Sequence, residues 1–144
     1  MRTTPQLREF SRAECLDRLR DVAFGRVGLS VDALPVIVPV FLTVIDDVVV
    51  FRTAPGTPLR AATGDAIVAV EVDTVDEHTG AGWTVLVRGA AHELEHGTRH
   101  EAAMSRLGEV WRDEGSGSFG TVWLDHDGHL VEVSTDLVTG QLLG

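Results

Sequence analysis

Valine-rich runs in which inward and outward positions alternate dominate this sequence. Between residues 67 and 73, Val68, Val70 and Val72 occupy one set of alternate positions, while Glu71 and Asp73 occupy the other. A period of two residues is that of a β-strand, whose successive side chains point to opposite faces of a sheet. The 144-residue chain contains 21 valines, and branched side chains suit pleated, half-buried surfaces. The pattern therefore predicts a mainly β protein.

Turn residues divide these runs into successive strands. We expect strands over residues 27–31, 36–45, 48–53, 67–73, 83–94, 122–124 and 130–133. Asp46-Asp47 separates the second run from the third and predicts a hairpin, because Asp favours local turns. Six or seven strands of this kind predict a small antiparallel barrel or sandwich with helical attachments.

Three helices are expected beside the strands. Ser11 and Glu14 form a capping-box pattern that predicts a helix over 12–23. Pro58 suits the first turn of a short helix over 58–63, and apolar residues at helical spacing predict another over 98–111. We expect one domain spanning 1–144, with residues 1–10 as a mobile arm.

Composition excludes several classes of partner. Twelve basic and 22 acidic residues give a net charge of −10, which argues against a nucleic-acid or anionic-membrane partner. The longest apolar run, Leu34–Ile45, contains two prolines and is too short to span a bilayer. The single cysteine, Cys15, cannot form an internal disulfide, and we expect a cytoplasmic protein. Because there is no lysine, arginine, backbone amides or hydroxyl groups must hold any bound anion.

A zinc-protease pattern, H-E-x-x-H, occurs at His92-Glu93-Leu94-Glu95-His96. That chemistry requires a helix, because two histidines four residues apart face one metal only when they lie one turn apart. The segment instead continues the strand predicted from Trp83, and Gly97 follows directly. We therefore predict histidines at a strand end, with no metal site, and metal-dependent hydrolysis remains only a third hypothesis.

The segment from Val50 to Arg60 is the strongest candidate for an anion site. A strand carries Arg52 and Thr53 to a glycine-containing loop with Thr57, and a helix follows. A guanidinium, hydroxyl groups and free helix amides that converge in this way suit phosphate. The alternative is an ordinary strand-loop-helix in which Arg52 pairs with a surface carboxylate. Trp83 and Thr84 begin a second candidate segment for a functional site. The alternative interpretation is an ordinary barrel strand with one aromatic side chain at its end.

Taken in order, several short motifs resemble the pyridoxamine 5′-phosphate oxidase-like family of FMN-binding split β-barrel proteins. They are Gly25-Arg26-Val27-Gly28, Leu34-Pro35 with Pro39-Val40-Phe41, Phe51-Arg52-Thr53 with Gly56-Thr57, Val70-Glu71-Val72-Asp73, Gly82-Trp83-Thr84-Val85 and Val138-Thr139-Gly140. The resemblance extends from about Ser11 to Leu143. It implies a split barrel of six to seven antiparallel strands, of Greek-key type, with two to three short helices.

The resemblance also implies a function and a site. It implies an FMN-dependent oxidoreductase, cytoplasmic and homodimeric, whose cofactor clefts lie between subunits and take a small-molecule substrate or electron acceptor. The flavin would perform the hydride chemistry, and no catalytic side chain is identified. The cofactor-binding residues it implies are Val40 and Phe41 beside the ring, Arg52, Thr53, Thr57 and Arg60 at the phosphate, and Trp83 and Thr84 near the ring or the dimer interface.

Three departures from the family pattern lower the positive charge around the cofactor. Pro58 stands where relatives carry lysine, Glu132 where they carry arginine within a strand, and Gln141 where arginine follows the glycine. Each lost charge-assisted contact weakens binding by roughly 1.5–3 kcal/mol. The alternatives are therefore a non-catalytic split-barrel protein with weakened FMN binding, or one that holds a deazaflavin or haem in the same cleft.

Overall fold

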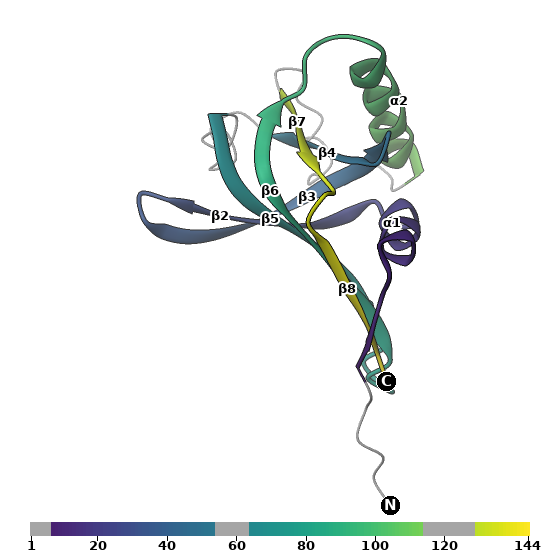
Figure 1. The fold of residues 1–144 in the computed structure, drawn as a ribbon. Coiled ribbons are helices and arrows are strands. Elements are labelled where there is room, and N and C mark those ends of the chain that lie inside the picture. The colour runs from purple at the N-terminus through teal and green to yellow at the C-terminus, as the bar shows by residue number, and fades with distance from the viewer. Residues whose placement is uncertain (1–6, 54–63, 114–128) are drawn as a thin grey trace, which may run out of the picture.

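The computed structural model describes residues 7–53, 64–113 and 129–144. In chain order its elements are β1 (Arg8–Glu9), α1 (Arg12–Arg20), β2 (Phe24–Val31), β3 (Leu34–Ile45), β4 (Val48–Thr53), β5 (Gly64–Val75), β6 (Gly82–Glu93), α2 (Thr98–Asp113), β7 (His129–Ser134) and β8 (Val138–Leu143) (Figure 1). The mainly β fold with short helices is confirmed. The helix expected over 58–63 and the strand expected over 122–124 lie outside the described residues.

Six of the strands close a barrel. Antiparallel pairing joins β2 to β3, β3 to β4, β4 to β7, β7 to β6, β6 to β5 and β5 back to β2. Strands β2 and β3 form one hairpin and strands β3 and β4 form another, with turns at Asp32-Ala33 and Asp46-Asp47. All four turn residues have positive φ, which is the geometry of two-residue hairpin turns that match strand twist. The hairpin predicted at Asp46-Asp47 is confirmed.

The long strand β6 splits between two partners along one edge. Its first half, Gly82–Val87, pairs with β8, and its last residues, Ala91–Glu93, pair with β7. Its other edge pairs with β5 over most of its length. The strand β7 bridges β4 and β6. The strand β8 was missed, because Thr139 and Gly140 interrupt its apolar pattern.

Helix α1 begins as its sequence predicts. The Ser11 hydroxyl accepts a hydrogen bond from the Glu14 amide, and the Glu14 carboxylate accepts one from the Ser11 amide, both at 3.2 Å. The helix ends at Arg20 rather than at residue 23. The reason is that the Ala23 carbonyl already accepts a hydrogen bond from the Leu42 amide at 3.0 Å, which begins the pairing of β2 with β3.

Part of the expected N-terminal arm belongs to the folded unit. Arg8 and Glu9 pair with β8, and the Phe10 amide donates to the Gly140 carbonyl at 2.9 Å. The Phe10 side chain is buried in the main core. Residues 8–10 are therefore held by the sheet, which corrects the expectation of a mobile segment over all of 1–10.

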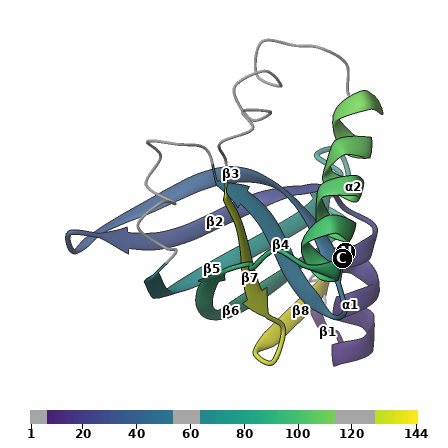
Figure 2. The ribbon, with the colours of Figure 1, turned by 90° about the horizontal axis from the view of Figure 1, so that it is seen from above.

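The main core fills the barrel and continues beneath α1. In β5, Val68, Val70 and Val72 are buried, as their alternation predicts. A second cluster lies outside the barrel under α2, and consists of Ile45, Val50, Leu94, Ala103, Leu107 and Leu130. Figures 1 and 2 show α1 and α2 on the outside of the strands. The helices thus cover parts of the outer surface and leave other parts of it open.

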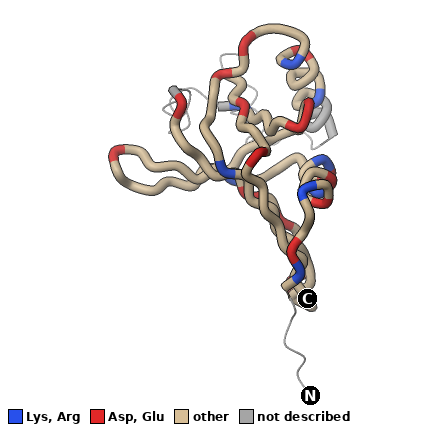
Figure 3. The backbone as a smooth tube through the Cα atoms, viewed as in Figure 1, with Lys and Arg blue, Asp and Glu red and all other residues tan. Residues whose placement is uncertain are grey.

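Acidic residues are spread along the described chain, while several arginines lie on the two helices (Figure 3). These arginines fasten the helices to the barrel. Arg12 donates to the Thr135 hydroxyl at 3.0 Å, Arg106 donates to the Val44 carbonyl at 2.7 Å, and Arg99 pairs with Glu132 at 2.8 Å. In the ranges that the structure describes, no helix is long and apolar enough to cross a membrane.

Cys15 is expected to resist thiol reagents in the folded protein. Its side chain is completely buried, and burial raises the pKa of the thiol, with a smaller contribution from the Glu14 charge. Since the thiolate is the reactive form, a disulfide reagent should label Cys15 only after denaturant is added. The measurement is the labelling rate with and without guanidinium chloride. Equal rates in the two conditions would contradict the buried position.

Candidate functional site

Arg52 lies on the outer face of β4, beneath α2. Alternation along the strand turns Val49 and Phe51 into the barrel and places Val50 and Arg52 outside, where Val50 belongs to the cluster under α2. The side chain of Arg52 is only 7% exposed, and its Nη2 lies 4.0 Å from the sulfur of Met104 in α2. A guanidinium covered in this way interacts strongly with an anion, because water screens it little.

Phe41 lies next to Arg52 on the neighbouring strand. The register pairs Leu42 of β3 with Phe51 of β4, and continuing it by one residue places Phe41 beside Arg52. Phe41 is half-buried and packs against both hydrophobic clusters. Its ring meets that of Phe24 edge to face, with centroids 5.2 Å apart. The outer face therefore offers aromatic surface next to a buried guanidinium.

Val40 and Trp83 lie on the inner side of their strands. Val40 is fully buried in the main core, and Trp83 is 8% exposed. The guanidinium of Arg18 in α1 lies 5.6 Å from the centre of the Trp83 ring. The structure therefore does not bring these two side chains together with Phe41 and Arg52. A cofactor outside the barrel would meet Val40 only through its backbone.

The predicted hydroxyl groups fall in different places. Thr84 lies on the outer face of β6, half-buried, and pairs with Asp73 on one side and Gln141 on the other. Thr53 is the last residue of β4, where its backbone pairs with His129. Thr57 and Arg60, like Pro58, lie outside the described residues. Of the eight predicted residues, the structure places Phe41 and Arg52 side by side.

Three side chains near Arg52 were not assigned to this site by the sequence analysis. His96, His100 and Met104 follow one another at intervals of four residues. This spacing, together with the expected helix, was the available signal, but it could not show which strand the helix covers. In the structure His100 and Met104 lie on α2, and His96 lies two residues before its first residue, Thr98.

The zinc-protease pattern does not form a helical site. His92 and Glu93 end β6, and His96 lies in the segment between β6 and α2, so the strand-end prediction is confirmed. His92 pairs with Asp65 at 2.6 Å, and His129 pairs with Glu93 at 2.5 Å. Within residues 7–53, 64–113 and 129–144, no group of three or more suitable side chains could hold a metal ion.

Glu132 forms an ion pair within the fold, and this pair balances its negative charge. It lies opposite Val50 on β7 and accepts a hydrogen bond from Arg99 of α2 at 2.8 Å. This ion pair attaches the helix to the strand that follows it in the sequence. Because Arg99 balances its charge, Glu132 repels an anion near Arg52 less than an isolated carboxylate would.

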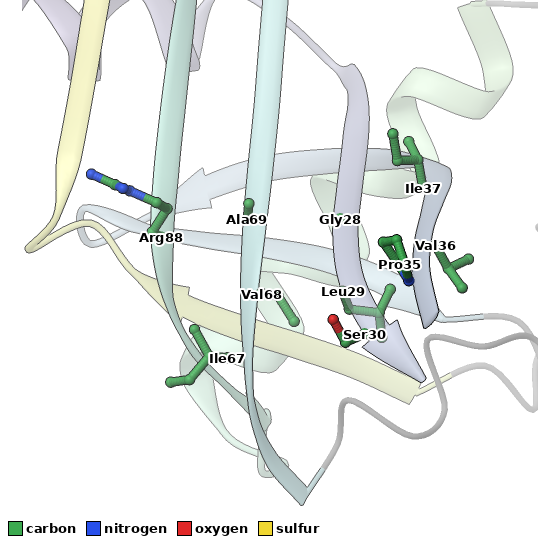
Figure 4. Close-up of a pocket in the computed structure, with 10 residues that line it drawn as sticks. All are labelled: Gly28, Leu29, Ser30, Pro35, Val36, Ile37, Ile67, Val68, Ala69 and Arg88. Atoms are coloured by element: carbon green, nitrogen blue, oxygen red, sulfur yellow. The ribbon is translucent and has the colours of Figure 1, made fainter. Parts of the chain in front are cut away.

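A separate part of the outer surface carries a shallow apolar groove. One row across four strands consists of Ile37, Gly28, Ala69 and Arg88. Gly28 and Ala69 are small, so the middle of the row is hollow, and the groove has a volume of about 330 Å³ (Figure 4). Ile37 and Ile67 in its lining are 73% and 70% exposed. Val40, Phe41, Arg52, Trp83 and Thr84, the predicted residues whose side chains the structure describes, do not line this groove.

Beside the groove lies an ionic cluster on the same face. Arg26 of β2 donates to Glu71 at 2.9 Å and to Asp73 at 3.0 Å, both in β5. Burial raises the pKa of Glu71 above its ordinary value, and Asp73 adds to this effect while Arg26 opposes it. The cluster places one positive charge between two acidic groups at the centre of an open sheet face.

Comparison with known proteins shows the family of this chain. A protein of Mycobacterium tuberculosis described as uncharacterized is 36% identical over 108 residues, which cover 72% of this chain and 70% of that protein. The structure of an FAD-binding protein from Mycobacterium smegmatis has a TM-score of 0.67 and 29% identity, and covers 95% of this chain and 98% of its own.

A more distant structure shares the fold. The FAD- and haem-binding protein from Mycobacterium smegmatis has a TM-score of 0.70 and 18% identity, and the match covers 94% of this chain and 73% of that one. The model of the family described as pyridoxamine 5′-phosphate oxidase matches residues 11–138, which include every strand from β2 to β7 and the first residue of β8. The chain therefore belongs to the pyridoxamine 5′-phosphate oxidase family, as its sequence motifs predicted.

Proposed function

We propose that this protein binds a flavin nucleotide, FMN or FAD, and acts as a flavin-dependent oxidoreductase. The observation that carries the proposal is the buried guanidinium of Arg52 beside the ring of Phe41, in a chain of this family. A bound flavin would supply hydride and electron transfer. In this arrangement Arg52 binds a phosphate oxygen, and the rings of Phe41 and Phe24 offer an apolar surface to the cofactor.

The relatives point to FAD as well as to the FMN expected from the sequence. One solved relative is described as FAD-binding and another as binding FAD and haem. FAD shares the riboflavin ring and the first phosphate of FMN, so Arg52 suits either nucleotide. The choice between them depends on how the second phosphate and the adenosine are held.

The test of flavin binding is direct. The purified protein is mixed with FMN or FAD, desalted and scanned for visible absorption, and the retained nucleotide is released by heat and identified by chromatography. We expect flavin absorption to stay with the protein at one nucleotide per chain. Protein that retains no chromophore, and shows no heat of binding with FMN or FAD in calorimetry, would contradict the proposal. A Soret band would instead indicate haem, and a blue-shifted band a deazaflavin.

A second candidate is a non-catalytic binding protein that keeps the barrel but binds flavin weakly. The observation that favours it is the position of Arg52, which α2 covers so closely that only a small part of the side chain meets solvent. Retained flavin that neither accepts electrons from a nicotinamide nucleotide nor passes them to a dye would support this function over the oxidoreductase.

We also propose that two copies of the chain associate through the open sheet face. Ile37 and Ile67 are large apolar side chains exposed on this face, beside the groove and the Arg26 cluster. A stable interface buries about 800 Å² per partner, and an apolar sheet face with a central charged cluster suits a second copy of itself.

Ile37→Arg is expected to convert this dimer into a monomer. Placing a charge on each copy at the same apolar contact is unfavourable, because a charge buried without a partner is strongly destabilising. Sedimentation equilibrium should give twice the chain mass of 15.5 kDa for the unchanged protein and the single mass for the variant. Leu7→Arg is the matched control, since Leu7 is 62% exposed and precedes β1, which pairs with the end of β8 that is far from the groove. A monomeric unchanged protein would contradict the dimer.

A further inference from the structure

Two histidines at the start of α2 differ from other nearby histidines in how their rings are paired. The rings of His96 and His100 lie against each other, with centroids 4.3 Å apart and planes inclined by 36°. His92 and His129 each pair with a carboxylate. In the part of the chain that the structure describes, no hydrogen bond or ion pair joins the ring of His96 or His100 to a carboxylate. We call His96 and His100 the imidazole pair.

The imidazole pair leads from the surface toward Arg52. His96 is exposed, His100 is half-buried, and Arg52 is buried. His100 and Met104 lie one turn apart on the same face of α2, and the Met104 sulfur lies 4.0 Å from Nη2 of Arg52. The side chains of His96 and His100, at the start of α2, and of Arg52, on β4, therefore lie at the same corner of the barrel.

Protonation of the imidazole pair would collect positive charge at this corner. The pKa of His100 lies below its ordinary value, chiefly because of burial and next because of His96, with a smaller contribution from Arg52. Glu101 acts in the opposite direction. The pair also lies at the beginning of α2, where the helix dipole disfavours a cation. An anion bound here would offset the repulsion of His100 by His96 and Arg52.

Several other charged groups around α2 pair with one another. Arg99 of α2 pairs with Glu132 of β7 and with Asp46 at the end of β3, at 2.8 and 3.6 Å. At the ends of β7 and β6, His129 pairs with Glu93. Glu101 follows His100 directly in α2 and is exposed. The charge that faces His100 from β4 is that of Arg52.

We propose that His96, His100 and Arg52 form an anion subsite, in which the protonated imidazole pair binds a phosphate group. The class of ligand is a phosphate monoester or diphosphate. The inference rests on the proposed function in that the phosphate is that of the bound flavin nucleotide. Affinity for the phosphate therefore rises as the pH falls and the imidazole pair gains protons, and it declines as the rings lose them.

The first test follows the ring protons of His96 and His100 by NMR between about pH 5 and pH 8, in chloride and in sulfate at equal ionic strength. Sulfate is the probe because its charge does not change over this range. If protonation strengthens anion binding about tenfold, saturating anion raises the pKa values by about one unit. We expect such a rise for both rings and none for His78. Unchanged pKa values for His96 and His100 would overturn the subsite.

The second test measures FAD affinity over the same pH range. Its diphosphate keeps a constant charge there, whereas a phosphate monoester has a second pKa of about 6. Affinity should increase about tenfold from high to low pH in the unchanged protein, the effect of one charge-assisted contact. His100→Gln and His96→Gln should flatten this profile, and His78→Gln should keep it. A profile that neither variant alters would overturn the subsite.

The two tests separate the subsite from the flavin proposal. Raised histidine pKa values in sulfate, without binding of FMN or FAD, would retain the subsite for another phosphate-bearing ligand and overturn the flavin proposal. Flavin binding with unchanged histidine pKa values would retain the flavin proposal and overturn the subsite. Because the NMR titration uses the unchanged chain, its outcome does not depend on whether a variant folds.

Discussion

Arg52→Ala is expected to weaken flavin binding by about ten- to a hundredfold. The change removes one charge-assisted contact to phosphate, which is worth roughly 1.5–3 kcal/mol. The contact is worth this much because Arg52 is only 7% exposed, and water screens a covered charge less than an open one. The measurement is the dissociation constant for FMN and FAD by calorimetry or by quenching of flavin fluorescence.

Two further variants separate the charge of Arg52 from its packing. Arg52→Lys keeps the charge but loses the planar fork that holds two oxygens at once, so its affinity should lie between those of the unchanged protein and Arg52→Ala. Met104→Leu changes the side chain that contacts Arg52 but keeps the guanidinium, and its affinity should be unchanged. If Arg52→Ala binds flavin as tightly as the unchanged protein, the phosphate lies elsewhere.

Phe51→Ala is expected to lower the free energy of unfolding by about 3–5 kcal/mol, the usual cost of removing a buried aromatic ring. Phe51 is 0% exposed and is the largest of the fully buried side chains described. It lies between Leu42 of β3 and Val131 of β7, with its ring in the main core. Because domains are typically stable by only 5–15 kcal/mol, this loss is a large part of the total.

The measurement for Phe51→Ala is the midpoint of unfolding in denaturant, at constant slope. The control is Leu137→Ala, in which a leucine that is 63% exposed is shortened. The control should change stability by less than about 0.5 kcal/mol. A loss below about 1 kcal/mol in Phe51→Ala would show that the ring does not fill the barrel core.

Local patterns predicted the elements well where their signal depends on near neighbours in the chain. The capping box at Ser11 and Glu14 forms as expected, and the alternation of β5 places its valines inside. The turn at Asp46-Asp47 joins β3 to β4 as expected. Each of these features depends on residues within a few positions of one another, so the sequence displays them directly.

The strands that close the barrel were harder to predict. Arg8–Glu9 is too short to show a period, and β8 contains Thr139 and Gly140, which weaken its apolar pattern. The strand β7 pairs with β4 and with the end of β6, and both partners are far from it in sequence. Pairing over such separations depends on which edges remain open once the other strands have joined, and no local residue pattern records this.

The candidate site also combines features that the sequence predicts with features that it does not. Alternation along β4 already places Arg52 on the same face as Val50, and the motif Phe51-Arg52-Thr53 suggested a phosphate ligand from the sequence alone. The sequence also displays the spacing of His96, His100 and Met104. These features follow from strand and helix periodicity, which is a property of the chain itself.

Only the tertiary structure shows that α2 covers Arg52 and brings His100 to it. Arg52 and Met104 are 52 residues apart, and their contact depends on how α2 packs over Val50 and Leu130. The packing of α1 on the main core likewise accompanies the burial of Trp83, although its sequence context suggested a place near the cofactor. Periodicity assigns a side chain to a face, but the elements that later pack on that face decide its surroundings.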